Sequence, residues 1–198
     1  MELELILEEL ERLGQDNDAL ATQRERKYLN ITRDTGQFLA VLVKASAAKS
    51  VLEIGTSNGY STLWLASALP DDGHVTTVEV SPQKIEEATS NFEKAKLGHQ
   101  ITIVKTDASS YLKQSDQRFD LVFLDADRSQ YADVAQEIVA LVRPGGLLIC
   151  DNAVSHASEL EAFMHAVAGT EEFTTALVPV GKGEFVACKR APMPTNSD

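Results

Sequence analysis

Residues 51 to 59 read Val51-Leu52-Glu53-Ile54-Gly55-Thr56-Ser57-Asn58-Gly59, and this stretch decides the fold. Its apolar start predicts a strand buried on both faces, and its two glycines predict a tight turn that opens a helix. A second apolar run, residues 75–80, carries Glu79 near its end. A glycine turn followed by an acid on the next strand is the arrangement that holds a nucleoside ribose in open parallel sheets.

The spacing of the glycines narrows the choice of ligand. A dinucleotide site shows Gly-x-Gly-x-x-Gly, whose glycines seat a pyrophosphate on a helix N-terminus. Here the turn reads Glu53-x-Gly55-x-x-x-Gly59, without the middle glycine and with an acid before it. The turn therefore resembles the first motif of class I S-adenosylmethionine-dependent methyltransferases, whose cofactor carries a sulfonium and no phosphate.

Composition limits the possible partners. A chain of 198 residues with 43% apolar residues can build one sizeable core, so we expect a single globular fold. The net charge of −12, without a Lys/Arg run, argues against nucleic acid and anionic membranes as partners. No segment approaches the roughly 20 apolar residues of a membrane helix. The acidic start lacks the basic residues of a secretory signal, which predicts a cytoplasmic protein. Cys150 and Cys188 fall in apolar runs and are predicted to be buried thiols rather than a disulfide or metal pair.

Apolar runs alternate with helical segments from residue 50 onward. Strands are predicted at residues 50–54, 75–80, 101–105, 120–125, 146–150, 173–180 and 184–189. Helices are predicted at residues 59–69, 82–97, 107–114, 129–142 and 156–168, with Pro144-Gly145-Gly146 as a helix stop. This alternation predicts an α/β fold with a Rossmann-like, doubly wound parallel sheet. The short turn Gly181-Lys182-Gly183 predicts a closing antiparallel hairpin, which makes the sheet mixed.

Two helices precede the sheet. The first carries a stripe at helical spacing and could end at Gly14, and the second runs from Asp34 to about Ala47. The stripe consists of Leu3, Ile6, Leu7, Leu10 and Leu13. Both helices could cover the core of the sheet, or the first could dock on a second subunit or cover the cofactor cleft. We divide the chain into an N-terminal helical arm (1–28), a catalytic domain (29–190) and a flexible tail (191–198).

Acidic residues end or follow five consecutive predicted strands. They are Glu53, Glu79, Asp107, Asp125 and Asp151. An Asp at such a junction is often only a helix cap, an alternative that stays open for Asp107 and Asp127. Asp125, Asp151 and Asn152 are predicted to share one crevice between neighbouring strands. Two carboxylates and an amide form either a site for a hard cation such as Mg²⁺ or a metal-free hydrogen-bonded network.

Several longer segments, taken in their order along the chain, resemble a known family more closely than the glycine turn alone. They are residues 30–38, 51–61, 119–127, 131, 144–146 and 151–152. Together they are similar to the cation-dependent O-methyltransferases of the catechol and caffeoyl-coenzyme A type. The match covers residues 28 to 190, and Phe123-Leu124-Asp125-Ala126-Asp127 with the later Asp151-Asn152 is its most specific part. The resemblance implies a seven-stranded sheet with an antiparallel last strand, and a homodimer.

The resemblance also implies roles for individual residues. It places Glu53, Gly55, Thr56 and Ser61 at the methionine part of the cofactor, with Thr32 nearby. It implies that Glu79 holds the ribose, and that Asp107 and the backbone of Ala108 meet the adenine. The cation ligands would be Asp125, Asp151 and Asn152. Asp125 would also border the cofactor, and Asp125 and Arg128 would be the catalytic pair.

Arg128 stands where the family usually has a lysine that assists deprotonation of the substrate. Because a guanidinium stays charged, Arg128 can only orient the substrate or stabilise an oxyanion. The family's aromatic residue after Asp-Asn is also missing, since residues 153–156 are Ala-Val-Ser-His. The main hypothesis is an S-adenosylmethionine-dependent O-methyltransferase acting on a small hydroxylated molecule. Alternatives are a metal-independent methyltransferase with another acceptor, a nicotinamide-dependent oxidoreductase and a non-catalytic cofactor-binding module.

Overall fold

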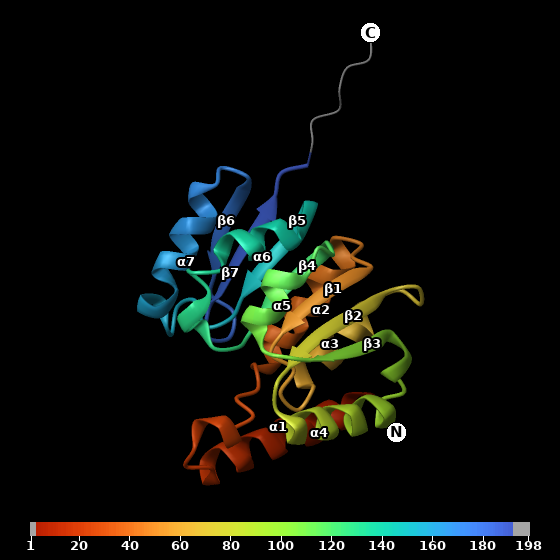
Figure 1. Cartoon of the computed structure of the whole chain (residues 1–198). Helices are drawn as coiled ribbons and strands as arrows, with labels where there is room; N and C mark the ends of the chain where they lie inside the picture. Colours follow the sequence, from red (N-terminus) through yellow and green to blue (C-terminus); the bar gives the residue numbers. More distant parts are fainter. Residues whose placement is uncertain (1–2, 192–198) are drawn as a thin grey trace.

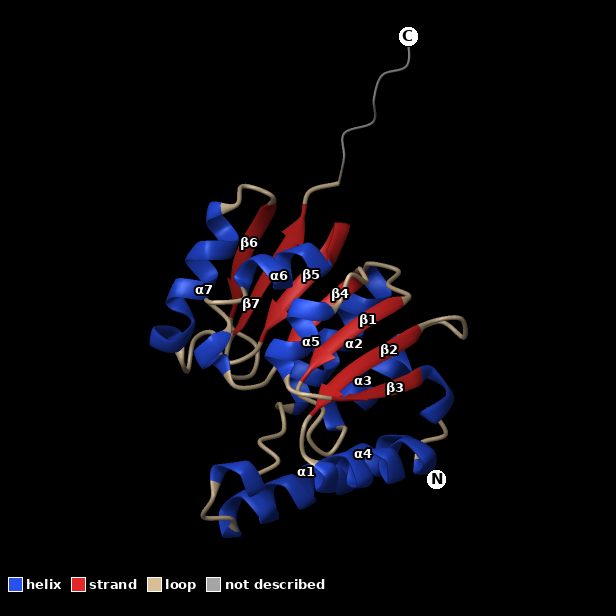
Figure 2. Cartoon of the chain, viewed as in Figure 1, coloured by secondary structure: helices blue, strands red, loops and turns tan. Residues whose placement is uncertain are grey.

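The computed structural model describes residues 3–191 and has one seven-stranded sheet between two layers of helices (Figures 1 and 2). The strand order is β3-β2-β1-β4-β5-β7-β6, and β7 runs antiparallel to both of its neighbours. The strands are β1 (Ser50–Ile54), β2 (His74–Glu79), β3 (Ile101–Lys105), β4 (Phe119–Leu124), β5 (Val142–Cys150), β6 (Phe173–Val178) and β7 (Glu184–Lys189). The predicted mixed, Rossmann-like α/β sheet is therefore confirmed.

The helices cover the sheet in two groups, each with its own apolar core. One face carries α5 (Ala108–Gln114), α6 (Ala135–Leu141) and α7 (Ala157–Gly169). The other face carries α1 (Leu3–Leu20), α2 (Arg33–Ala45), α3 (Tyr60–Ala68) and α4 (Pro82–Lys94). Short 3₁₀ turns are η1 (Arg24–Arg26), η2 (Gly98–Gln100) and η3 (Arg128–Gln130).

The strand order reverses direction at β1. The chain moves outward from β1 to β2 and β3, and then returns to β4 on the other side of β1. Ligands of open parallel sheets bind at such a switch point, beyond the carboxyl ends of the strands. The ends of β1, β2 and β4 are therefore where the site must be sought.

The helix predicted at residues 129–142 is wrong in its length. The structure has the short turn η3, then α6 from Ala135, and β5 already begins at Val142. Pro144-Gly145-Gly146 thus lies inside a strand and does not stop a helix. Val142 pairs with Phe119, and the register between β4 and β5 shifts before Leu121 pairs with Leu147. Such irregularities accommodate proline and glycine in a strand.

The first helix does not end at Gly14, as the sequence had suggested, but continues to Leu20. Gly14 is buried, and a Cβ there would lie 2.5 Å from the side-chain nitrogen of Asn30. Asn30 uses that nitrogen to donate a hydrogen bond to the carbonyl oxygen of Leu10. The glycine therefore serves a close packing contact and is not a terminator.

The apolar stripe of α1 packs on its own domain. Ile6, Leu7 and Leu10 are buried in the same core as the first crossover helix α3. Leu13 is partly exposed, at 40%. The structure thus supports the reading in which α1 covers the core, and the boundary at residue 28 stays a prediction. The predicted tail falls outside the described residues from 192 onward.

Leu7→Ala is expected to lower the free energy of unfolding by about 2–4 kcal/mol, because it leaves a cavity in a closed core. Leu7 is 1% exposed, whereas Leu5 on the same helix is 54% exposed. Leu5→Ala is the matched control and should change stability by less than about 0.5 kcal/mol. Urea denaturation of both variants measures the difference. Equal midpoints would show that α1 is not part of the cooperative core.

Both cysteines are free, as predicted, but only Cys150 is buried. Cys188 is exposed, which corrects the expectation of two buried thiols. Its strand β7 lies next to the edge strand β6, and the residues toward the end of β7 are less buried than those of the central strand β4. No helix between residues 3 and 191 combines the length and apolar character needed to cross a bilayer.

Candidate active site

The glycine turn lies directly against the end of β4. Gly55 has a φ of 109°, and a Cβ there would lie 2.3 Å from the carbonyl oxygen of Asp125. The amides of Gly55 and Thr56 both donate to the carbonyl oxygen of Val78, at 3.1 and 3.2 Å. Only glycine combines this backbone angle with this approach. The turn is thereby held between the carboxyl ends of β2 and β4.

Glu79 is fixed at the end of β2 by backbone amides. One carboxylate oxygen accepts from Ser57 N at 2.9 Å, and the other accepts from Val80 N and Ser81 N, each at 2.9 Å. Ser81, not Glu79, caps α4 by accepting from the backbone N–H of Lys84. The structure thus places the carboxylate beside the glycine turn, in the position predicted for a ribose-binding acid.

Glu53 is completely buried and lies beneath the turn. Its carboxylate accepts hydrogen bonds from the hydroxyls of Ser61 at 2.6 Å, Thr77 at 2.6 Å, and Thr62. Burial raises the pKa of Glu53 to about 7, although the three hydroxyls act in the opposite direction. Glu53 thus braces β1, β2 and α3 against one another at the point where they support the turn.

Glu53→Gln is expected to flatten the pH dependence of stability between pH 4.5 and 7. Folded Glu53 keeps its proton up to about pH 7, while in the unfolded chain it loses the proton near its ordinary pKa of 4.5. The folded state therefore binds more protons in this window, and stability falls as the pH rises, by at most about 3 kcal/mol from this group. Urea melts at several pH values measure the difference between the two proteins. Parallel curves would show that Glu53 is ionised in the folded state.

Asp107 caps helix α5, so the capping alternative holds for it. Its carboxylate accepts from the amide of Ser110 at 2.9 Å, and the contact with Ser110 lowers the pKa of Asp107. Asp107 is exposed, and Ala108 follows it as the first residue of the helix. Asp127 likewise caps η3 through the amide of Ser129. Each cap uses only Oδ1 of the carboxylate. A ligand contact at Asp107 therefore stays a prediction.

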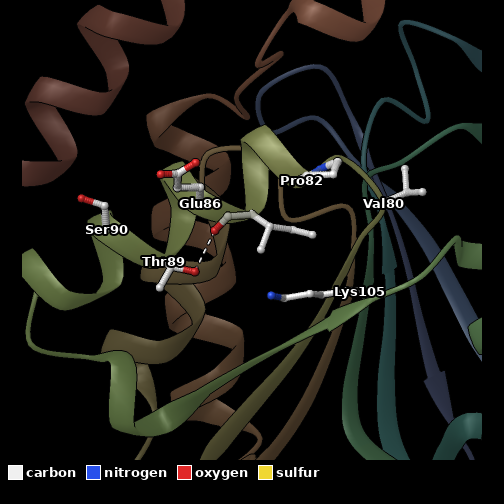
Figure 3. A pocket seen from close by; sticks show the side chains of 7 residues that line it. Val80, Pro82, Glu86, Thr89, Ser90 and Lys105 are labelled. Carbon is white, nitrogen blue, oxygen red and sulfur yellow. Dashed lines mark hydrogen bonds between the residues drawn. The ribbon is translucent and has the colours of Figure 1, made fainter.

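A cavity of about 680 Å³ opens beside the residue that follows Glu79 (Figure 3). Its lining is formed by Val80, Pro82, Ile85, Glu86, Thr89, Ser90 and Lys105. The lining includes neither the glycine turn nor the acids that follow β4 and β5. The cavity therefore flanks the predicted cofactor site and is not its centre.

Asp125, Asp151 and Asn152 follow the neighbouring strands β4 and β5, as predicted. Asp125 N donates to Ile54 O at 3.0 Å and Asp151 N donates to Leu124 O at 3.1 Å, which continues the strand ladder into the site. Asn152 has a φ of 67°, and its side-chain nitrogen donates to Asp151 Oδ2 at 2.6 Å. Burial and the charge of Asp151 raise the pKa of Asp125 well above its usual range.

Glu184 joins this group, and the sequence reasoning missed it. It is completely buried at the start of β7, where Oε1 accepts from the hydroxyl of Thr35 at 3.1 Å. Burial and the neighbouring Asp151 raise the pKa of Glu184 to about 10. Thr35 in turn contacts Thr32, the N-cap of α2, so Thr32 lies on the side of the acids. The only signal in the sequence is an acid after Gly181-Lys182-Gly183, and such an acid is usually solvated.

The donor set suits a hard cation by its chemistry. It consists of neighbouring carboxyl groups and one amide, and among the described residues Glu184 Oε2 has no hydrogen-bond partner. Within residues 3–191, however, no three His, Cys, Asp or Glu side chains are arranged as a metal-binding group. The residues are therefore brought together, but the cation itself remains a proposal.

Arg128 lies at the other side of this group, on η3. It is 8% exposed, and its Nε has no hydrogen-bond partner among the described residues. Its nearest acid is Glu159 of α7, whose Oε2 lies 3.9 Å from Nε. The positive charges of Arg128 and Lys182 act to lower the pKa of Asp125. His156, the one histidine near the site, occupies the N-cap position of α7.

Known proteins share both the sequence and the fold. A family model described as O-methyltransferase matches residues 3–186. A catechol O-methyltransferase of Niastella koreensis is 33% identical over 177 residues, which covers 83% of this chain and 80% of that protein. An O-methyltransferase of Bacillus cereus in complex with S-adenosylhomocysteine has a TM-score of 0.80 and 28% identity, covering 93% and 90% of the two chains.

A third protein extends this comparison to the methyl donor itself. An O-methyltransferase of Streptomyces achromogenes, involved in tomaymycin synthesis and bound to S-adenosylmethionine, has a TM-score of 0.74 and 28% identity, with 82% of each chain covered. The family match covers most of the chain. It agrees with the strand order, the glycine turn and the acid at the end of β2. This chain belongs to the O-methyltransferase family and is a class I S-adenosylmethionine-dependent O-methyltransferase.

Proposed function

We propose that this enzyme transfers a methyl group from S-adenosylmethionine to a hydroxyl of a small, catechol-like molecule, with the help of a divalent cation such as Mg²⁺. The observation that carries the proposal is the group Asp125, Asp151 and Asn152 beyond β4 and β5, directly beside the Gly55 turn. The relative from Niastella koreensis, named a catechol O-methyltransferase, supports the acceptor class.

The chain's own residues would divide the work of binding the cofactor, which supplies a methyl group on a sulfonium. Glu79 would accept hydrogen bonds from the ribose hydroxyls, since amides already aim its carboxylate at the turn. Gly55 and Thr56 would let the methionine part approach the backbone, with Thr32 nearby. Glu53 and Ser61 would support that part from beneath. Asp107 and the Ala108 backbone would border the adenine.

The cation would be held by Asp125, Asp151 and Asn152. A divalent cation lowers the pKa of a hydroxyl that coordinates it, and so would favour ionisation of the acceptor. Asp125 would thereby align the acceptor oxygen with the cofactor, because its backbone carbonyl lies against Gly55 and the preceding Leu124 pairs with Cys150 of β5. Alignment of the reacting groups contributes much of the rate in such transfers. Arg128 would orient the acceptor or stabilise its oxyanion, and it cannot accept the proton.

The direct test is methylation of catechol by the purified enzyme with S-adenosylmethionine, followed by mass spectrometry, with Mg²⁺ or with EDTA. We expect a product 14 Da heavier than catechol, as the chemistry of methylation demands, in the presence of Mg²⁺ and almost none in EDTA (roughly a hundredfold less). Full turnover in EDTA would favour the metal-independent alternative. Binding of S-adenosylmethionine without turnover of any catechol would favour the non-catalytic module.

Three further expectations belong to the same proposal. The enzyme would act as a homodimer, as the resemblance implies. It would work in the cytoplasm, consistent with its acidic composition. It would not bind nucleic acid, because a net charge of −12 repels the phosphate backbone. Sedimentation with and without DNA tests the first and third of these.

A further inference from the structure

We propose that the methyl acceptor carries an anionic group, such as a carboxylate, which is bound by Arg128 and the N-terminus of helix α7. This inference rests on the proposed function and names the acceptor more closely. It assigns to Arg128 the recognition of a substituent on the acceptor, and not a role at the reacting oxygen.

The first observation is the buried Nε of Arg128, which has no hydrogen-bonded partner among the described residues. Arg128 is 8% exposed. The distance of 3.9 Å between Nε and Glu159 Oε2 is too long for a hydrogen bond. A buried N–H donor without a hydrogen-bonded partner is costly, and a ligand that supplies an acceptor removes that cost. The planar fork of arginine matches the two oxygens of a carboxylate.

The second observation is independent of the first. Helix α7 is 13 residues long, and its N-cap residue His156 makes no side-chain hydrogen bond to the helix. Nδ1 of the His156 ring instead shares a hydrogen bond with the hydroxyl of the preceding Ser155, at 2.9 Å. An uncapped N-terminus presents free amide N–H groups and a positive partial charge, both of which favour an anion. Arg128 lies against this same end of α7, where Glu159 belongs to the first turn.

The position of this pair relative to the acceptor site follows from the backbone. His156 N donates to Asn152 O at 2.9 Å, so α7 begins directly after the predicted cation ligands. Arg128 follows Asp125 by one short turn. An acceptor whose hydroxyl meets Asp125 and Asp151 therefore has Arg128 and the α7 N-terminus nearby.

A second cationic side chain, Lys182, borders the same space. The backbone amide of Ser155 donates to Lys182 O at 3.0 Å, and the amide of Ala153 donates to Gly183 O at 2.7 Å. These bonds hold the turn between β6 and β7, and with it Lys182, against the loop that leads into α7. The opposing acids are Glu159, which is exposed, and Asp127, which is engaged in capping η3. Two cations, Arg128 and Lys182, therefore border this space, although the protein as a whole is acidic.

The test compares two acceptors of nearly equal shape, 3,4-dihydroxybenzoate and 3,4-dihydroxybenzamide, under identical Mg²⁺ and S-adenosylmethionine concentrations. We expect kcat/KM for the acid to exceed that for the amide by about tenfold or more, mainly through KM. Arg128→Gln should bring this ratio close to one, and Arg128→Lys should preserve part of it because a cation remains. Lys182→Gln should lower the ratio by a smaller factor. Lys113→Gln, an exposed lysine on α5, is the matched control and should leave the ratio unchanged.

Equal use of the two acceptors by the unaltered enzyme would overturn the inference while leaving the proposed function intact. An equal fall in kcat for both acceptors in Arg128→Gln would also overturn it, because that result places the guanidinium at the reacting oxygen. If the enzyme methylated neither of these compounds and not catechol either, the proposed function itself would have failed. Thermal stabilisation of each variant by S-adenosylhomocysteine checks that it is folded, and Arg128→Lys provides the comparison if Arg128→Gln does not fold.

Discussion

Asp151→Ala is expected to abolish methylation of a catechol while leaving the affinity for S-adenosylhomocysteine within about twofold. Asp151 follows β5 and faces Asn152, Asp125 and Glu184, on the acceptor side of the Gly55 turn. Its removal takes away one of two carboxylates proposed to hold the cation. Since the cation would lower the pKa of the acceptor hydroxyl, turnover should fall by at least about a hundredfold. Product formation by mass spectrometry and cofactor binding by calorimetry measure the two effects separately.

Asp127→Ala is the matched control for this experiment. Asp127 lies two residues beyond Asp125 but is exposed and caps η3, so it should lose only a few tenths to about 1 kcal/mol of stability and little activity. Asp151→Asn keeps the size of the side chain and removes its charge. If Asp151→Ala retained full activity that EDTA does not affect, the cation mechanism would be wrong and the metal-independent alternative would take its place.

Glu79→Ala is expected to weaken cofactor binding by about 1.5–3 kcal/mol, which is roughly 10- to 150-fold in Kd. The carboxylate would lose its charge-assisted contact with the ribose hydroxyls. It would also release the amide of Ser57, which it holds at 2.9 Å in the glycine turn. Calorimetric titration with S-adenosylhomocysteine measures the affinity.

Glu79→Gln separates the loss of the charged ribose contact from the release of the Ser57 amide, and Glu86→Ala is a control. Glu79→Gln keeps a hydrogen-bond acceptor for Ser57 but removes the charge, so it should lose less affinity than Glu79→Ala. Glu86→Ala removes an exposed acid from α4, at the flanking cavity, and should leave the affinity unchanged. Unchanged binding in a folded Glu79→Ala variant would refute the placement of the ribose. Stabilisation by NADH and not by S-adenosylhomocysteine would contradict the assignment of the cofactor.

The residues near the strand ends could be placed from the sequence because their signals are local. Val51 to Ile54 is continuous in apolar residues apart from Glu53, and the glycines follow at once. Since parallel strands bring their carboxyl ends to one edge of the sheet, the acids in or after the last residues of β1, β2, β4 and β5 were expected to lie at that edge. The seven strands were predicted from the same alternation, with ends that differ by a few residues.

The sequence by itself thus determined the fold class, the glycine turn and most of the acids that meet at the candidate site. Only the tertiary structure decided features that depend on contacts between distant residues. Glu184 meets Thr35 across 149 positions of the chain, and no local pattern encodes that meeting. Gly14 ends no helix because Asn30 packs on it, and the helix expected at residues 129–142 gives way early to a strand that pairs with β4. The sequence predicted Arg128 as a site residue, but only the tertiary structure shows that it is buried and that its nearest acid is Glu159 of α7. Local propensity is a matter of tenths of a kcal/mol to about 1 kcal/mol per residue, and burial against a distant partner outweighs it.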